Sequence, residues 1–418
     1  MQYEITAPRS LDATICLPAS KSISNRALII HALSKGDIMP RHLSDCDDTE
    51  VMVAALRDMP HEIDIKAAGT AMRFLTALLS VREGEEHIIT GTDRMKHRPI
   101  ALLVDALRYL GADISYEGED GYPPLRIRGK ALEGGHIEIA GNVSSQYISA
   151  LLMTGPVLKN GLELKMNNGI ASRPYIDLTL WMMREFGADA DWSEVDTVTV
   201  KPQPYRQHQY YIESDWSAAS YWYEMLALHG SDDAVLHLGG LADGSKQGDS
   251  VVRYIYSLMG IKTSFERRDD EMPTSVSIQQ KLPCHLPRLD YDFISSPDLA
   301  QTVVVTCALL DIPFRFTGLA SLKIKETDRI EALKRELLKL GYVLHDEGGD
   351  TLLWDGTRCT PTYAPIDTYE DHRMAMAFAP AAIKVPGIVI NDPGVVSKSY
   401  PHYWDDLRHA GFTIMERP

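Results

Sequence analysis

The chain has 418 residues, of which 44% are hydrophobic and 24% are charged, and its 42 basic and 58 acidic residues give a formal net charge of −16. This composition is typical of a globular protein with two or three domains, and it excludes disordered and fibrous chains. The acidic balance argues against a broad basic surface for nucleic acid or an anionic membrane.

The cysteine pattern and the N-terminal residues indicate the cellular compartment of the protein. Five scattered cysteines without a CxxC pair argue against a disulfide framework and against a zinc site. The opening stretch, MQYEITAPRS, lacks a basic and then apolar signal pattern, and no run approaches the roughly 18 apolar residues of a membrane span. We therefore expect a cytoplasmic protein without a membrane segment.

The stretch PASKSISNR, residues 18–26, opens the first long apolar helix. Ser20 is expected to cap this helix, and Lys21 and Arg26 fall within its first two turns. A helix N-terminus already carries about half a positive charge. Two cations there favour a bound phosphate or carboxylate opposite them, whereas side chains bent into solvent would explain the same pattern.

The chain repeats this type of helix, a small polar start followed by an apolar run. The copies begin at residues 20, 69, 144, 214, 295 and 371, at spacings of 49, 75, 70, 81 and 76 residues. Helices that are apolar nearly all round are expected in the interior. The short first spacing predicts that a strand or more is missing between Asp58 and Gly69.

A second type of helix is amphipathic and ends in Gly before an extended run. Its copies end at Gly111, Gly187, Gly260, Gly341 and Gly411, and Pro60 takes the Gly place in a sixth copy. Gly adopts the left-handed conformation of a helix end without strain. Alternating segments at 87–90, 136–140 and 197–201 are typical of strands.

Each repeat therefore reads as strand, buried helix, strand, amphipathic helix and strand. Six repeats in two sets of three predict an α/β fold of two similar domains, with helices inside and sheets outside. We place one domain at residues 20–213, with the shortened first repeat, and the other at residues 1–19 plus 214–418.

Polar residues gather at the helix starts, and KETDR, residues 325–329, is expected to open the helix that ends at Gly341. Capping or a solvated face explains any one of them, but their recurrence predicts a cleft for a ligand with more than one anionic group. Asp298 and Glu326 stand among cations, which suits proton transfer, although a surface ion pair of Glu326 with Arg329 is an alternative. The chain has no GxGxxG, GxxxxGK[ST] or HExxH motif, which argues against a nucleotide or metal site.

Nine segments together resemble the EPSP synthase family of enolpyruvyl transferases. They are SKSISNRAL (20–28), AGTAMR (68–73), RMKHRPI (94–100), SSQ (144–146), SRPYID (172–177), PD (297–298), KETDR (325–329), DHRMAM (371–376) and SKSYP (397–401). The resemblance implies two domains of three βαβαββ repeats each, of the inside-out α/β barrel type. It also implies transfer of the enolpyruvyl group of phosphoenolpyruvate to the 5-hydroxyl of shikimate 3-phosphate, through a tetrahedral adduct that releases phosphate. The resemblance further implies that the reaction would take place in a cleft between the domains, without a metal or organic cofactor, and we expect a monomer.

The resemblance also implies roles for individual residues. Shikimate 3-phosphate would be bound by Lys21, Ser22, Arg26, Ser144, Ser145, Gln146, Ser172, Tyr175, Asp298, Ser321 and Lys325. Phosphoenolpyruvate would be bound by Lys21, Gly69, Arg98, Gln146, Glu326, Arg329, His372, Arg373 and Lys398. Glu326 would protonate C3 of the enol, Asp298 would take the proton of the attacking hydroxyl, and Lys21 would contact the developing charge.

Some positions depart from the family pattern, and other functions remain open. Ala19, Ala67, Phe74 and Ser321 replace the usual residues, which leaves the response to the inhibitor glyphosate undecided. A UDP-N-acetylglucosamine enolpyruvyl transferase usually carries a reactive Cys on a loop of the first domain, and the RMKHRPI region has none. An RNA 3′-phosphate cyclase would call for a basic surface, and a non-catalytic repeat protein that binds anions would not need Asp298 and Glu326 among the cations.

Overall fold

The computed structural model describes residues 1–266 and 274–417, and the chain divides into two compact units. Unit 1 consists of Met1–Ala19 and Glu213–Pro418, and unit 2 consists of Ser20–Ile212. The second crossing of the chain, after Ile212, lies one residue before the boundary expected from the sequence.

Unit 2 is built of helices and two four-stranded sheets. Its helices are α1 (Lys21–Ser34), α2 (Asp47–Asp58), α3 (Gly69–Ser80), α4 (Asp93–Lys96), α5 (Ala101–Tyr109), α6 (Ser145–Thr154), η1 (Gly155–Val157) and α7 (Arg173–Glu185). Its strands are β3 (Glu62–Asp64), β4 (Glu86–Thr90), β5 (Asp113–Tyr116), β6 (Leu125–Arg128), β7 (Gly135–Ala140), β8 (Leu162–Asn167), β9 (Ala190–Trp192) and β10 (Thr197–Val200). The sheet orders are β3-β4-β6-β5 and β7-β8-β10-β9.

Unit 1 has the same kinds of element. Its helices are α8 (Trp216–His229), η2 (Gly248–Val251), α9 (Val252–Ser257), η3 (Pro297–Leu299), α10 (Ala300–Leu309), η4 (Ala320–Ile324), α11 (Arg329–Lys339), α12 (His372–Phe378), η5 (Ala379–Ile383), η6 (Pro393–Lys398) and α13 (Tyr403–His409). Its strands are β1 (Gln2–Thr6), β2 (Asp12–Cys16), β11 (Val235–Gly239), β12 (Ile261–Glu266), β13 (Ser275–Gln280), β14 (Leu289–Asp292), β15 (Phe314–Thr317), β16 (His345–Glu347), β17 (Thr351–Trp354), β18 (Ile388–Asn391) and β19 (Thr413–Arg417).

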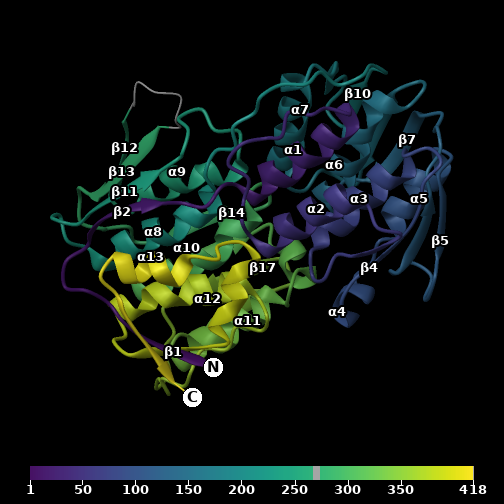
Figure 1. Cartoon of the computed structure of the whole chain (residues 1–418). Coiled ribbons are helices and arrows are strands. Elements are labelled where there is room, and N and C mark those ends of the chain that lie inside the picture. The colour runs from purple at the N-terminus through teal and green to yellow at the C-terminus, as the bar shows by residue number, and fades with distance from the viewer. Residues whose placement is uncertain (267–273, 418) are drawn as a thin grey trace. The chain divides into compact units, whose positions relative to one another are not determined.

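One connection pattern recurs in the sheets. The first two strands of a repeat are joined along the chain by a buried helix, and they pair with each other in parallel. The last two strands form an antiparallel hairpin, and the final strand also pairs with the second strand of the repeat. The N-terminal segment completes two sheets of unit 1, because β2 pairs in parallel with β11 and β1 lies between β18 and β19. Figure 1 shows the purple β2 beside the teal β11.

The helices of the first type lie in the interior, as the sequence predicts. Residues 23–30 of α1 and residues 147–154 of α6 are buried throughout, and so are all residues of α10 and α12. The sheets cover these helices, which confirms the predicted fold. None of the described helices is both long and apolar enough to cross a membrane.

The predicted glycines close the amphipathic helices. Gly111, Gly187, Gly260, Gly341 and Gly411 all have φ between 83° and 104°. The prediction for the sixth copy is wrong: Met59, with φ 37°, closes α2 instead of Pro60. The proline ring fixes φ near −65°, so the left-handed turn falls on the preceding residue.

The first repeat lacks its hairpin. Helix α2 ends at Asp58 and β3, which belongs to the next sheet, begins at Glu62. A single parallel bridge between Arg41 and Tyr211 stands where the first two strands of this repeat would pair. The short spacing in the sequence therefore corresponds to a missing pair of antiparallel strands.

Candidate active-site residues

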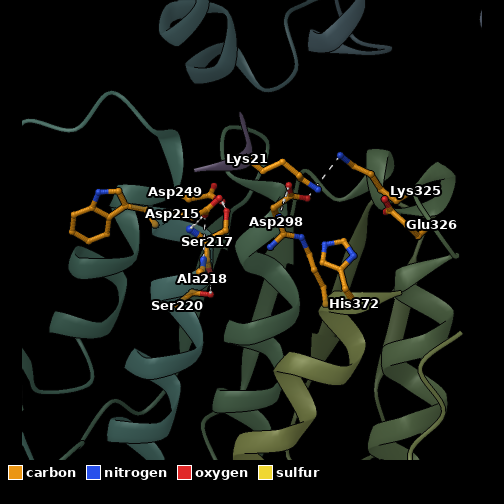
Figure 2. Close-up of polar contacts among 12 residues, drawn as sticks. Lys21, Asp215, Ser217, Ala218, Ser220, Asp249, Asp298, Lys325, Glu326 and His372 are labelled. Carbon is orange, nitrogen blue, oxygen red and sulfur yellow. Dashed lines mark hydrogen bonds and ion pairs between the residues drawn. The ribbon is translucent and has the colours of Figure 1, made fainter. Parts of the chain in front are cut away.

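Helix starts in unit 1 bring cations and carboxylates together. Asp298, in the η3 turn ahead of α10, lies 3.0 Å from Arg329 Nη1, 3.0 Å from Arg373 Nη2 and 3.8 Å from Lys325 Nζ. Figure 2 shows Asp298, Lys325, Glu326 and His372 at neighbouring ends of these helices. The sequence predicts all of them as site residues, although they are as many as 75 residues apart.

Arg329 is the centre of this group and is 1% exposed. Its Nε donates to Asp371 Oδ2 (2.7 Å), its Nη1 to Asp298 Oδ1 (3.0 Å), and its Nη2 to Glu326 Oε2 (2.9 Å) and Asp371 Oδ1 (3.3 Å). These bonds use four of the five N–H donors of the guanidinium. The ion pair of Glu326 with Arg329 is present, but it is not a surface pair, because the Arg329 side chain is 2% exposed and the Glu326 side chain 14%.

The cations Lys325, Arg329, Arg373 and Lys398 are called the cation cluster below. Lys398, at the end of η6, lies 3.2 Å from Glu326 Oε1, so Glu326 bridges two cations. Helix α11 begins at Arg329, with Asp328 as its capping residue. The expectation that Lys325 and Glu326 lie within this helix is wrong, because the Asp328 side chain caps the first turn and ends the preceding loop.

The pKa values of Asp298 and Lys325 are shifted by burial and by the charges around them. Burial acts to raise the pKa of Asp298, but attraction by Arg373, Lys325 and Arg329 outweighs it and holds that pKa far below its ordinary value. The pKa of Lys325 is lowered: attraction by Asp298 acts to raise it, and burial and the charge of Arg329 outweigh that attraction. A carboxylate held ionised among cations orients a hydroxyl group well, and it gains basicity when an anionic ligand shares those cations.

His372 and Ser321 occupy the edges of this group. His372 is 2% exposed, and its Nδ1 lies 3.7 Å from Asp371 Oδ1. Ser321 lies in η4, four residues ahead of Lys325 in the chain, and is partly buried.

In unit 2 the start of α1 places Lys21 and Arg26. Lys21 Nζ lies 3.4 Å from Asp48 Oδ2, and the Lys21 side chain is 17% exposed. Ser20 occupies the capping position, but its side chain makes no capping hydrogen bond, so the predicted cap is wrong. The Ser20 hydroxyl is buried and has no partner among the described residues, instead of lying over the first turn.

Arg26 is 2% exposed, so the alternative of a solvated side chain is wrong for this residue. Its guanidinium donates to the hydroxyls of Thr179 (2.7 Å) and Ser149 (3.1 Å) and to the carbonyls of Ser22 (2.9 Å) and Tyr175 (3.4 Å). Burial lowers the pKa of Arg26 to about 10, and Tyr175 only partly offsets this effect. A cation that is buried among neutral oxygens favours an anion nearby.

Gly69 allows two guanidinium groups to approach the start of α3. A Cβ atom at Gly69 would lie 2.7 Å from Nη1 of Arg98 and 2.9 Å from Nη1 of Arg73. Arg73 Nη1 also donates to Gln146 Oε1 (2.7 Å), and Gln146 Nε2 donates to the Thr70 hydroxyl (3.1 Å). Arg98, Gly69 and Gln146, which lie in three separate motifs, thus meet at one helix N-terminus that suits an anion.

Three predicted serines lie at the starts of α6 and α7. Ser144 is the residue before α6, Ser145 begins it, and Ser172 precedes α7 with φ 55°. Within the described residues their hydroxyls form no hydrogen bond to the chain, so all three are open to a ligand. Tyr175 lies in the first turn of α7 and is partly buried.

Several residues of these groups are not among the site residues predicted from the sequence. Asp371 is fully buried, caps α12 through the Arg373 N–H (2.9 Å) and pairs with Arg329. Asp48 pairs with Lys21, and Arg73 holds Gln146. The motifs DHRMAM and AGTAMR contain Asp371 and Arg73, but an acid at a helix start is indistinguishable from an ordinary cap in the sequence.

Among the described residues, no group of His, Cys, Asp or Glu side chains is arranged to hold a metal ion. The groups described above consist instead of cations, hydroxyls and a few carboxylates. The cations and hydroxyls among them donate directly to phosphate and carboxylate groups.

Comparison with known proteins supplies a family. The model of the family described as EPSP synthase (3-phosphoshikimate 1-carboxyvinyltransferase) matches residues 5–64 and 59–407. The chain is 60% identical to the 3-phosphoshikimate 1-carboxyvinyltransferase of Bacteroides fragilis over 415 residues, which cover 99% of each chain. It is 34% identical to that of Vibrio campbellii, over 95% of this chain and 96% of the relative.

A solved structure agrees with the fold. The chain is similar to EPSP synthase from Acinetobacter baumannii, with a TM-score of 0.78 at 22% sequence identity, and the match covers 99% of this chain and 100% of the other.

Proposed function

The chain belongs to the EPSP synthase family, and we propose that its polar helix starts bind shikimate 3-phosphate and phosphoenolpyruvate. The reaction transfers the enolpyruvyl group of phosphoenolpyruvate to the 5-hydroxyl of shikimate 3-phosphate and releases phosphate. The observation that carries the residue assignment is the buried Arg329, which is hydrogen-bonded to Asp298, Glu326 and Asp371. This arrangement places a candidate acid and a candidate base on one fixed cation.

Phosphoenolpyruvate carries a phosphate and a carboxylate, and both groups suit the cations described above. We assign its binding to Lys21, Gly69, Arg98, Gln146, Glu326, Arg329, His372, Arg373 and Lys398. Arg329 has one N–H donor left for a ligand, and Arg373 has a guanidinium that also contacts Tyr221 (3.3 Å). The approach of Arg98 to Gly69 supports the assignment in unit 2.

Shikimate 3-phosphate is richer in hydroxyls, and we assign it to Lys21, Ser22, Arg26, Ser144, Ser145, Gln146, Ser172, Tyr175, Asp298, Ser321 and Lys325. The open hydroxyls of Ser144, Ser145 and Ser172 support this choice, because hydroxyls both donate to phosphate oxygens and accept from sugar-like hydroxyls. Arg26 contributes a buried positive charge.

The chemistry then uses the two carboxyl groups in opposite senses. Glu326 protonates C3 of the enol, which leaves C2 open to attack by the 5-hydroxyl, and Asp298 accepts the hydroxyl proton as the bond to C2 forms. Elimination from the tetrahedral adduct returns the C3 proton to the Glu326 carboxylate and expels phosphate, which takes up the proton held by Asp298. Cations hold the pKa of Asp298 low in the free protein, and Glu326 contacts Arg329 and Lys398. An anionic ligand would share these cations, so its binding favours the protonated form of each carboxyl group and prepares both groups for proton transfer.

The test is to follow phosphate release from phosphoenolpyruvate, first with shikimate 3-phosphate and then with UDP-N-acetylglucosamine as acceptor. We expect phosphate release when shikimate 3-phosphate is the acceptor and none when UDP-N-acetylglucosamine is the acceptor. Release with the nucleotide sugar alone, or with neither acceptor, would contradict the proposal.

A further inference from the structure

Asp249 occupies a position that is functional in the other repeats. Four second helices begin near a residue that the proposed function uses: Arg98 before α5, Ser172 before α7, Glu326 before α11 and Lys398 before α13. In the repeat of α8, the same place at the start of the second helix is held by Asp249, in the turn η2 that leads into α9. Asp249 is not among the residues assigned to substrate binding or proton transfer.

The surroundings of Asp249 differ from those of an ordinary surface acid. Asp249 is 2% exposed, and the hydroxyl of Ser217 donates to its Oδ2. Its Oδ1 is buried and has no hydrogen-bond partner within the part of the chain that the structure describes. The N–H groups of Ser217 and Ala218 donate to Asp215, at 2.7 and 3.2 Å, so Asp215 rather than Asp249 caps α8.

Charged and titratable groups face Asp249 from several elements. They are Asp298 of η3, Arg373 of α12, Asp215 beside α8 and Tyr291 of β14, and Arg253 follows one turn later on α9, where it pairs with Asp243. Figure 2 shows Asp249, Asp215 and Ser217 beside Asp298.

Asp298 and Asp249 are neighbouring acids with different partners. Asp298 contacts three cations, whereas Asp249 forms no ion pair among the described residues. Burial, followed by the charge of Asp298, raises the pKa of Asp249 to about 7, whereas the cations lower that of Asp298. Environments that separate the pKa values of two neighbouring acids divide their roles between an ionised and a protonated group.

We propose that Asp249 is a positioning residue whose protonated form keeps the cation cluster positive, and that its ionisation weakens binding of phosphoenolpyruvate. The inference rests on the proposed function. Among the described residues, the ion pairs of these four cations involve three carboxylates, Asp298, Glu326 and Asp371, so these seven groups carry a formal charge of 4 − 3 = +1. An ionised Asp249 would reduce this charge to zero, and a like charge near an anion lowers its affinity.

The experiment compares the KM for phosphoenolpyruvate of the wild-type protein and Asp249→Asn, at saturating shikimate 3-phosphate, from about pH 6 to about pH 8.5. The ratio of wild-type to variant KM removes the titration of the substrate phosphate itself. A ratio near one at the acid end, rising to about five- to tenfold at the alkaline end, is expected for one added negative charge beside the cation cluster in a partly screened site. The matched control is Asp233→Asn, an exposed acid of unit 1, for which the same ratio should stay near one throughout.

A second variant keeps the test decisive if Asp249→Asn does not fold. The Ser217 hydroxyl bond favours the ionised form of Asp249, so Ser217→Ala should move the midpoint of the KM transition to higher pH. A flat ratio for Asp249→Asn, or an unmoved midpoint for Ser217→Ala, would overturn the positioning role. Failure of the wild-type protein to release phosphate with shikimate 3-phosphate would overturn the proposed function instead.

Discussion

Arg329 and Asp371 form a buried bidentate ion pair, with Nε 2.7 Å from Oδ2 and Nη2 3.3 Å from Oδ1. Asp371 has no exposed surface, and Arg329 has 1%. Burial acts to lower the pKa of Arg329, but attraction by Asp371, Glu326 and Asp298 raises it above the ordinary value. Asp371 therefore fixes the guanidinium on which the assigned acid and base both depend.

We expect Asp371→Asn to lower both stability and activity. Removing one partner of a buried ion pair costs about 3–5 kcal/mol when the other charge is left uncompensated. Asp298 and Glu326 still pair with Arg329 in this variant, so we expect a loss of stability of about 3 kcal/mol. Misplacing Arg329 should also lower kcat/KM for phosphoenolpyruvate by about 10- to 100-fold. Urea unfolding and phosphate release measure the two effects.

The control for this prediction is the exposed pair of Asp405 and Arg408, at 2.9 Å, with side chains 72% and 40% exposed. Asp405→Asn should cost less than about 1 kcal/mol, because water screens the pair, and should leave turnover unchanged. Equal losses of stability in the two variants would show that the buried pair has no special role.

Glu326→Gln should separate binding from chemistry. The amide keeps the size of the side chain but cannot supply a proton to C3, and positioned acids contribute about 10²- to 10⁴-fold to a rate. We expect kcat to fall by a factor in that range, while the Kd for phosphoenolpyruvate in the presence of shikimate 3-phosphate changes by only a few fold. Stopped-flow turnover and calorimetric titration give the two values.

Glu331→Gln is the matched control, since Glu331 lies on the same helix and pairs with Lys334, with a side chain 39% exposed. Its kcat should equal that of the wild-type protein. A fully active Glu326→Gln variant would remove Glu326 as proton donor.

Much of the fold could be predicted because each repeat has a recognisable local sequence pattern. Glycines at helix ends and unbroken apolar helices are visible without any long-range information, and all five glycine positions have the expected left-handed backbone. The bridge of Arg41 to Tyr211 could not be predicted, because it joins residues 170 positions apart and consists of a single backbone pairing. Nothing in the spacing indicates which segment pairs with residue 41 in this first repeat.

The candidate site was predictable where the residue type itself is unusual in its place. Cations at a helix N-terminus, such as Lys21 and Arg26, require an explanation, and they drew attention to the site. Asp371 and Asp249 did not, because an acid at a helix start is what capping alone produces. Asp371 contacts Arg329 and Asp249 lies near Asp298, and in both cases the neighbour belongs to another repeat. These contacts and the burial of the two acids are visible only in the three-dimensional structure.

Glu224 should make the stability of the protein depend on pH. This residue lies in the middle of α8 and is fully buried, and burial raises the pKa of its carboxyl well above 4.5, with a partial offset from the Thr306 hydroxyl. An acid whose pKa is higher in the folded state stabilises the fold below its unfolded pKa. That stability is lost progressively as the pH rises from the unfolded pKa to the folded pKa.

We therefore expect Glu224→Gln to gain stability relative to the wild-type protein with rising pH, at a slope of about 1.4 kcal/mol per pH unit above about pH 4.5. The slope ends where Glu224 ionises in the folded protein. Urea unfolding at a series of pH values measures this difference. Glu194→Gln, at an exposed turn, should show no such slope, and a difference for Glu224→Gln that is constant with pH would contradict the prediction.

Ser172 should show a conflict between stability and binding. Its φ of 55° and ψ of 39° lie in the left-handed region, where a residue with a Cβ atom is strained by about 1–2 kcal/mol. Glycine removes that strain but adds chain entropy to the unfolded state, so Ser172→Gly should gain about 0.5–1 kcal/mol of stability. The same variant loses a hydroxyl assigned to shikimate 3-phosphate, and one hydrogen bond to a charged group is worth about 1.5–3 kcal/mol. The KM for shikimate 3-phosphate should therefore rise by about tenfold or more.

Asn168→Gly provides the matched control for Ser172→Gly. Asn168 has φ 64° in the same loop and is exposed, and it has no assigned contact with a substrate. Its replacement should raise stability by a similar amount and leave the KM for shikimate 3-phosphate unchanged. If Ser172→Gly is stabilised without any loss of affinity, the left-handed turn at the start of α7 is a feature of the loop alone, and the Ser172 hydroxyl has no part in binding.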